Sequence, residues 1–188
     1  DFERAIAPME QYASDIGLLY DQYPNHPHLL SESVYAQTAV LGLLNDAKSL
    51  SSTELEERVN KVVAAAEAAI QIAPNDREII DAYSSAMYHG ANAYMKSCRV
   101  FDALPLRKNA VSNARRALSL DPKNREYKDE LAVTLTAAGD SLMNSVRIIE
   151  GIESYLEAIE IYEELLASDP ENRYQQRQLL RTKIVLLV

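Results

Sequence analysis

Hydrophobic residues recur along this chain at intervals of three and four, which is the spacing of one face of an α-helix. The alternation typical of a half-buried strand is absent from the sequence, and β-branched residues do not cluster. The pattern therefore predicts an all-α protein. About eight helices are expected, over residues 8–23, 28–45, 53–73, 77–99, 106–120, 125–145, 152–168 and 173–187.

Local signals indicate where these helices begin and end. Breaks are expected at 46–52, near 100–105 and near 146–151. Ser51 and Glu54 have the spacing of a capping box, which predicts a helix start just after Ser51.

The chain contains an internal repeat marked by proline. Pro74, Pro122 and Pro170 are 48 residues apart, and Pro24 lies 50 residues before the first of them. Asp76, Asn124 and Asn172 follow these three prolines and suit the N-cap of the next helix. The prolines themselves are expected to end the helix before them.

The residues before each proline also agree between units. Small or apolar residues stand twelve, eight, five and four positions upstream, which predicts one packed helix face in each unit. They are Val62, Ala66, Ala69 and Ile70, then Ala110, Ala114, Ala117 and Leu118, then Ala158, Tyr162, Leu165 and Leu166.

Two units share one spacing of residues before their proline. In one unit Ala158 and Tyr162 precede Pro170, and in the other Ala110 and Ala117 precede Pro122 at matching positions. This frame resembles the second helix of the tetratricopeptide repeat, with Leu165 and Ala114 departing from its pattern. Gly139 suits the family's glycine, where two helices cross closely. The family's tryptophan is missing, and its period is about 34 residues rather than 48. The stretch at 121–140 is similar to long-period repeats of bacterial multidomain signalling proteins, some attached to serine/threonine kinases.

The resemblance implies a right-handed α-solenoid of antiparallel helix pairs, and the runner-up fold is a helical bundle or another α-solenoid. One helical-repeat domain over 1–188 is expected, with units of roughly 1–24, 25–74, 75–122, 123–170 and a partial 171–188. A length of 188 residues suits one domain. A first residue other than Met and an apolar end lead us to expect part of a longer protein.

The resemblance also implies a function, which is a protein–protein interaction module or scaffold within a larger signalling or regulatory protein. Its groove would be lined by the first helix of each pair and would take a peptide or a partner protein. The expected groove residues are Tyr88, Asn92, Met95, Lys96, Thr136, Asp140, Met143 and Asn144. The alternative is a structural spacer or dimerisation domain that positions a separate catalytic domain, with a homodimer formed through the C-terminal helix.

The charge of the chain further restricts the classes of partner that it is expected to bind. The net charge is −9, and residues 1–76 contribute −8 of it from 4 basic and 12 acidic residues. This balance argues against nucleic acid and against anionic membranes, and we expect a cytoplasmic protein. A basic stripe at Arg173, Arg177 and Arg181 is a secondary candidate site, for an acidic peptide or a phosphate.

Candidate chemistry is sparse, so we expect no enzyme, cofactor or metal. His26 and His28 lie in a proline-rich turn without further ligands for zinc, and we interpret them as polar turn residues. Cys98 has no base within reach of its thiol, and we expect it to face the core as a small residue. The glutamates between 150 and 164 have the spacing of a solvated helix face. A catalytic or metal-binding α domain remains a third alternative.

Overall fold

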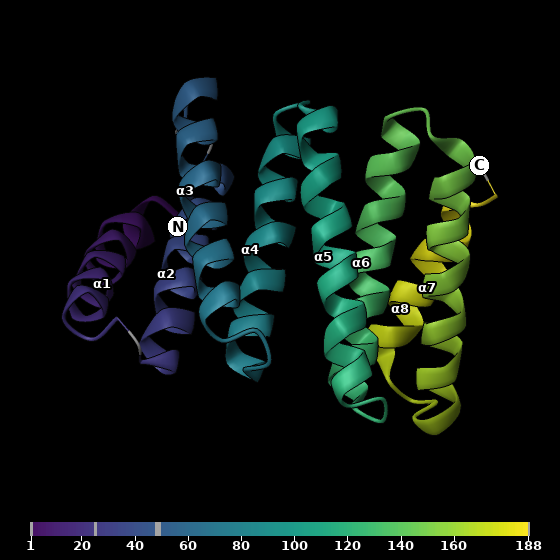
Figure 1. The fold of residues 1–188 in the computed structure, drawn as a ribbon. Coiled ribbons are helices and arrows are strands. Elements are labelled where there is room, and N and C mark those ends of the chain that lie inside the picture. The colour runs from purple at the N-terminus through teal and green to yellow at the C-terminus, as the bar shows by residue number, and fades with distance from the viewer. Residues whose placement is uncertain (1, 25, 48–49, 188) are drawn as a thin grey trace. The chain divides into compact units, whose positions relative to one another are not determined.

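In the computed structural model, which describes residues 2–24, 26–47 and 50–187, the described chain forms eight α-helices and no strand (Figure 1). The helices are α1 (Phe2–Gln22), α2 (Pro27–Asp46), α3 (Ser52–Ile72), α4 (Arg77–Lys96), α5 (Val100–Leu120), α6 (Arg125–Asn144), α7 (Ile148–Ser168) and α8 (Arg173–Val185). The prediction of an all-α protein is confirmed. None of the described helices is long and apolar enough to span a membrane.

The 48-residue repeat reappears in the helix bounds. Helices α3, α5 and α7 begin 48 residues apart, and so do α4, α6 and α8. Helices α1 and α2 precede α3 and α4 by 50 residues. The connection between α2 and α3 covers 47–51, whereas the one between α4 and α5 covers 97–99, so these two extra residues account for the longer first period.

The predicted helix caps are present. The side chain of Asp76 accepts a hydrogen bond from the Ile79 amide, and Asn124 and Asn172 cap α6 and α8 in the same way. Ser51 and Glu54 form a reciprocal capping box at the start of α3. Each such bond satisfies an N–H group that the first helical turn leaves without a partner.

The chain divides into two compact units, Asp1–Arg99 and Val100–Val188. In the first unit α2 packs against α1, α3 and α4, and α3 also packs against α4. In the second unit α6 packs between α5 and α7, and α7 packs against α8. The helices thus pack mostly with their sequential neighbours. That residues 1–188 form one continuous helical-repeat domain stays a prediction.

The predicted small-residue faces form the core of each unit. Ala66, Ala69, Ala110, Ala114, Ala117 and Ala158 are all fully buried. In the second unit Ala114 and Ala158 lie in one cluster with Leu131, Leu135 and Tyr162. Small side chains allow neighbouring helices to approach closely, and the longer ones fill the space that remains.

Three predicted helix starts are wrong. Helices α1, α5 and α7 begin at Phe2, Val100 and Ile148, rather than at 8, 106 and 152. Pro8 and Pro105 lie inside α1 and α5 and do not end them. Each proline removes a backbone donor close to the helix start.

The turns before α5 and α7 are compact because Cys98 and Val146 take a left-handed backbone, with φ of 58° and 64°. The Arg99 amide donates to the Tyr94 carbonyl at 2.9 Å, and the Arg147 amide donates to the Leu142 carbonyl at the same distance. These are the bonds of a Schellman motif, which closes a helix within three residues. Cys98 is exposed in this turn, so the expectation that it faces the core is wrong.

Replacing Val146 by glycine is expected to raise the free energy of unfolding by about 1 kcal/mol. A β-branched residue is strained at positive φ, and Val146 is 80% exposed, so its side chain contributes little packing. Chemical denaturation of both proteins measures the difference. Val146→Ala is the control, because it keeps a Cβ and should bring much less of the gain. An unchanged or lower stability of Val146→Gly would contradict the strain.

Helices α6 and α7 cross closely at Gly139, as predicted. A Cβ atom at Gly139 would lie 2.7 Å from Cε1 of Tyr155. Gly151 faces the same crossing from α7, where a Cβ would lie 2.9 Å from the sulfur of Met143. The Tyr155 hydroxyl donates to Oδ1 of Asp140 at 2.7 Å. This crossing engages two of the predicted groove residues, Asp140 and Met143, in internal packing.

Candidate functional site

The predicted groove residues of the first unit lie along α4. Tyr88, Asn92 and Met95 are half-buried, and Lys96 is exposed. The rings of Tyr88 and His89 meet edge to face, with their centroids 5.4 Å apart. The Lys96 ammonium pairs with the carboxylate of Asp46 on α2. Lys96 and Asp46 line a pocket of about 540 Å³ where α2 and α4 end.

Two predicted groove residues of the second unit, Thr136 and Asp140, contact α7 or α8. Thr136 is 6% exposed, and its hydroxyl lies 3.4 Å from that of Thr182, so it offers little surface to a partner. Asp140 accepts from the hydroxyl of Tyr155 and lies 3.4 Å from Nη2 of Arg181. Asn144 is exposed and donates to the carbonyl of Asp140.

The basic stripe lies on the surface of α8. Arg173, Arg177 and Arg181 are all exposed. Arg181 is paired with Asp140, while no ion pair is recorded for Arg173 or Arg177 with any described residue. Two cations of the stripe are therefore available to an anion.

The histidines lie at the start of α2. His26 is the N-cap residue and makes no side-chain cap bond, and His28 is exposed. In the described part of the chain, no three or more His, Cys, Asp or Glu side chains are grouped so as to hold a metal ion.

His28 joins α2 to α4, because its Nδ1 lies 3.1 Å from Oε2 of Glu78. The hydrogen bond to Glu78, and then its charge, raise the pKa of His28 above 6.5. The same bond lowers the pKa of Glu78. The histidine therefore stabilises the fold below pH 6.5, and this contribution disappears as the pH rises through its folded pKa.

We expect Glu78→Gln to return the pKa of His28 toward 6.5, because the carboxylate that favours the imidazolium is lost. A titration of the histidine Cε1–H signals by NMR measures this pKa. The same titration in denaturant supplies the unfolded reference. A pKa of His28 that is equal in the wild type and in Glu78→Gln would contradict the contact.

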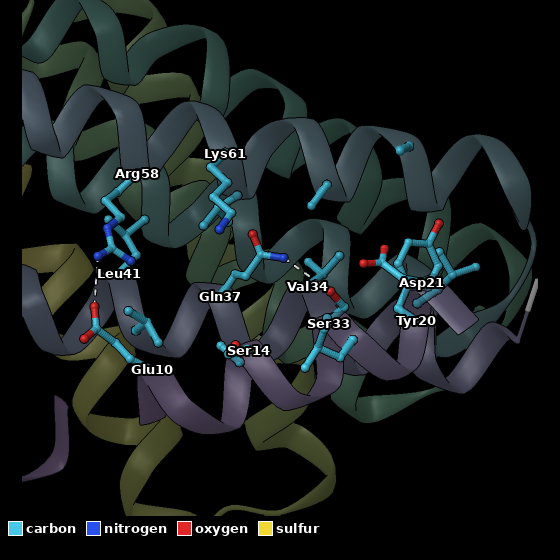
Figure 2. Close-up of a pocket in the computed structure, with 18 residues that line it drawn as sticks. Glu10, Ser14, Tyr20, Asp21, Ser33, Val34, Gln37, Leu41, Arg58 and Lys61 are labelled. Atoms are coloured by element: carbon cyan, nitrogen blue, oxygen red, sulfur yellow. Dashed lines mark hydrogen bonds and ion pairs between the residues drawn. The ribbon is translucent and has the colours of Figure 1, made fainter. Parts of the chain in front are cut away.

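Sequence reasoning missed a cleft between α1, α2 and α3. It encloses about 470 Å³ and lies within the first unit (Figure 2). Its walls are mostly small and apolar, with Val34 and Leu41 on α2, and Arg58 and Lys61 extend into it from α3. The guanidinium of Arg58 pairs with the carboxylate of Glu10 at 2.9 Å and so bridges α1 and α3.

A second cleft lies between α5, α6 and α7 and encloses about 840 Å³. By the helix bounds it occupies the same place in the repeat as the first cleft. It is bridged by Arg115 and Glu157, whose Nη2 and Oε2 atoms are 2.6 Å apart. No signal in the sequence pointed to either bridge, because Glu10 and Arg58 are 48 residues apart and Arg115 and Glu157 are 42 residues apart.

Neither the protein-family models nor the curated proteins include a match to this chain. The resemblance to the tetratricopeptide repeat therefore rests on the residues and helix bounds given above.

Proposed function

We propose that this chain is a protein–protein interaction module of the tetratricopeptide-like class, within a larger signalling or regulatory protein. Its helix pairs would form a solenoid whose first helices, α2, α4, α6 and α8, present side chains to a peptide or a partner protein. The observation that supports this best is the pairwise repetition of the helix bounds at 48 and 50 residues. Stacked helix pairs of this kind serve in proteins as extended binding surfaces.

Helix α4 carries the surface that we propose contacts the partner. Tyr88, Asn92 and Met95 lie in a row and are partly exposed, and Lys96 adds a charge at the end of the helix. Aromatic residues and methionine are enriched in protein interfaces, and methionine adapts to different partners. In α6 the equivalent Thr136, Asp140 and Met143 pack against α7 or α8, and only Asn144 is exposed, so we place the main contact on α4.

The test is affinity capture from a native lysate with the full chain as bait. The variant carries Tyr88→Ala, Asn92→Ala and Lys96→Glu. The matched control carries Glu57→Lys and Asn60→Ala on the exposed face of α3. Circular dichroism and thermal unfolding establish that all three proteins fold equally.

We expect a protein that the wild type and the control retain and that the α4 variant loses. Equal retention by all three baits would overturn the α4 surface. Capture of nothing besides the bait itself would favour the second candidate function.

That second candidate is a spacer or dimerisation domain without a peptide ligand. It is favoured by the exposed apolar side chains of Leu180, Ile184 and Leu187 on and just after α8. Light scattering over a range of concentrations would then give a mass rising toward twice 21.0 kDa, and Ile184→Glu would abolish the rise. A constant monomer mass would exclude the dimerisation form of this candidate.

A further inference from the structure

Helices α3, α5 and α7 bury the same face, which α1 leaves open. On α7 this face consists of Gly151, Tyr155, Ala158, Tyr162 and Leu165, and the equivalent residues of α3 and α5 are also buried. By the helix bounds, the equivalent residues of α1 are Ala5, Met9, Tyr12, Ile16 and Leu19. None of these five residues of α1 is buried, and Tyr12 and Leu19 are 41% and 42% exposed. Helix α1 therefore presents an apolar face that the other second helices use for packing.

Helix α8 leaves open the matching face of a first helix. Leu180, Ile184 and Leu187, on and just after α8, are 61%, 49% and 85% exposed. The positions 48 residues earlier on α6 are buried, and they hold Ala132, Thr136 and Gly139. The ring of Tyr155 on α7 covers Gly139. Helix α8 therefore exposes apolar side chains where α6 receives the helix that follows it.

The charges of the two open helices are opposite. Helix α1 contains four acidic residues and one basic residue, for a net charge of −3. Helix α8 contains four basic residues and no acidic residue, for a net charge of +4. Opposite charges favour the encounter of two surfaces and suppress the pairing of either surface with itself.

One pair of charges falls at equivalent ends of the helices. Arg125 at the start of α6 lies 3.8 Å from the carboxylate of Asp169, just after α7. Its equivalent at the start of α8 is Arg173, and the last turn of α1 carries Asp21. Arg173 and Asp21 are both exposed, so each is accessible to a second molecule.

We propose that the open face of α8 docks onto the open face of α1 in a second copy of this chain. Helix α1 of the second copy lies antiparallel on α8, as α7 lies on α6 (Figure 1). Leu187 then meets Met9 where Gly139 meets Tyr155, so a larger residue on the first helix is matched by a slimmer one on the second. Arg173 pairs with Asp21 of the other copy.

This contact joins two different surfaces, which makes it heterologous. Burial of the exposed leucine and isoleucine side chains supplies its main driving force. It lies apart from the α4 surface and so goes beyond the function proposed there. It also differs from dimerisation through two copies of α8, because α8 meets α1.

Sedimentation equilibrium of the full chain tests the contact. The mass of the wild type is expected to rise with concentration to twice 21.0 kDa or more. Ile184→Glu places a charge on the α8 face and Leu19→Glu places one on the α1 face, so each variant alone is expected to stay a monomer. Phe101→Glu is the matched control, because Phe101 is 76% exposed at the start of α5, and it should associate like the wild type. Circular dichroism establishes that every variant is folded.

A mixture of the two monomeric variants decides whether α8 meets α1. Ile184→Glu keeps an intact α1 face, and Leu19→Glu keeps an intact α8 face. Equal amounts of the two are therefore expected to form a one-to-one dimer that stops at two chains. Dimerisation through two copies of α8 would instead leave Leu19→Glu self-associating by itself.

Charge reversal tests the antiparallel orientation. Asp21→Arg is expected to weaken association by about threefold, because it opposes Arg173 with a like charge. Adding Arg173→Glu to the same chain should restore the affinity of the wild type. A double variant as weak as Asp21→Arg would overturn this orientation.

Three results would overturn the contact itself: a wild type that stays a monomer, self-association of Ile184→Glu or Leu19→Glu alone, or a mixture that forms no dimer. The first result would leave both faces to other occupants. None of these results bears on capture by the α4 surface. A failure of this proposal is therefore distinguishable from a failure of the proposed function.

Discussion

Tyr155→Ala is expected to lower the free energy of unfolding by about 4 kcal/mol. Tyr155 is among the largest fully buried side chains, at 1% exposure, and its ring fills the space above Gly139 where α6 and α7 cross. Removing the ring leaves a cavity that two crossed helices can close only in part. Urea denaturation followed by circular dichroism measures the change.

Tyr155→Phe keeps the ring and removes only the hydroxyl, so it measures what the hydroxyl contributes to stability. The hydroxyl donates to Asp140, and burial together with this bond raises the pKa of Tyr155. We expect a loss of about 1 kcal/mol, because Asp140 is half-exposed and retains Arg181. If Tyr155→Ala were no more destabilising than Tyr155→Phe, the ring would not support the crossing.

Gly139→Ala is expected to lower the free energy of unfolding by about 2 kcal/mol, although alanine favours helices. The added Cβ would lie 2.7 to 2.9 Å from three ring atoms of Tyr155, closer than van der Waals contact allows. The ring is held by burial and by its bond to Asp140, so α6 and α7 must move apart. Thermal unfolding of the two proteins checks this.

Gly42→Ala is the matched control, since it makes the same chemical change inside α2. Nothing lies within 4 Å of the Cβ position at Gly42. At this position only the higher helix propensity of alanine acts, and we expect the free energy of unfolding to rise by about 0.5–1 kcal/mol. The two substitutions should thus have opposite signs. A gain at Gly139 equal to that at Gly42 would contradict close packing of α6 on α7.

The clefts show why the candidate site was only partly predictable from the sequence. Lys61 and Leu41 come from different helices, and no local pattern joins them. The bridge between Glu10 and Arg58 likewise joins side chains that are 48 residues apart. The sequence placed the groove on α4 and α6, and whether a partner binds there stays a prediction. The structure shows that Thr136 and Asp140 are engaged with α7 and α8.

The sequence by itself determined the features that depend on neighbours along the chain. The caps at Ser51, Asp76 and Asn124 and the repeat marked by Pro74 and Pro122 all follow from bonds or conformations within a few residues. The period of three and four likewise identified the buried faces, because a helix turns at a constant rate.

Only the tertiary structure decided what depends on contacts between helices. Which side chains bridge two helices, as Arg115 and Glu157 bridge α5 and α7, depends on residues that are far apart in sequence. Packing between the helices brings these side chains together, and local helix propensity carries no information about that packing.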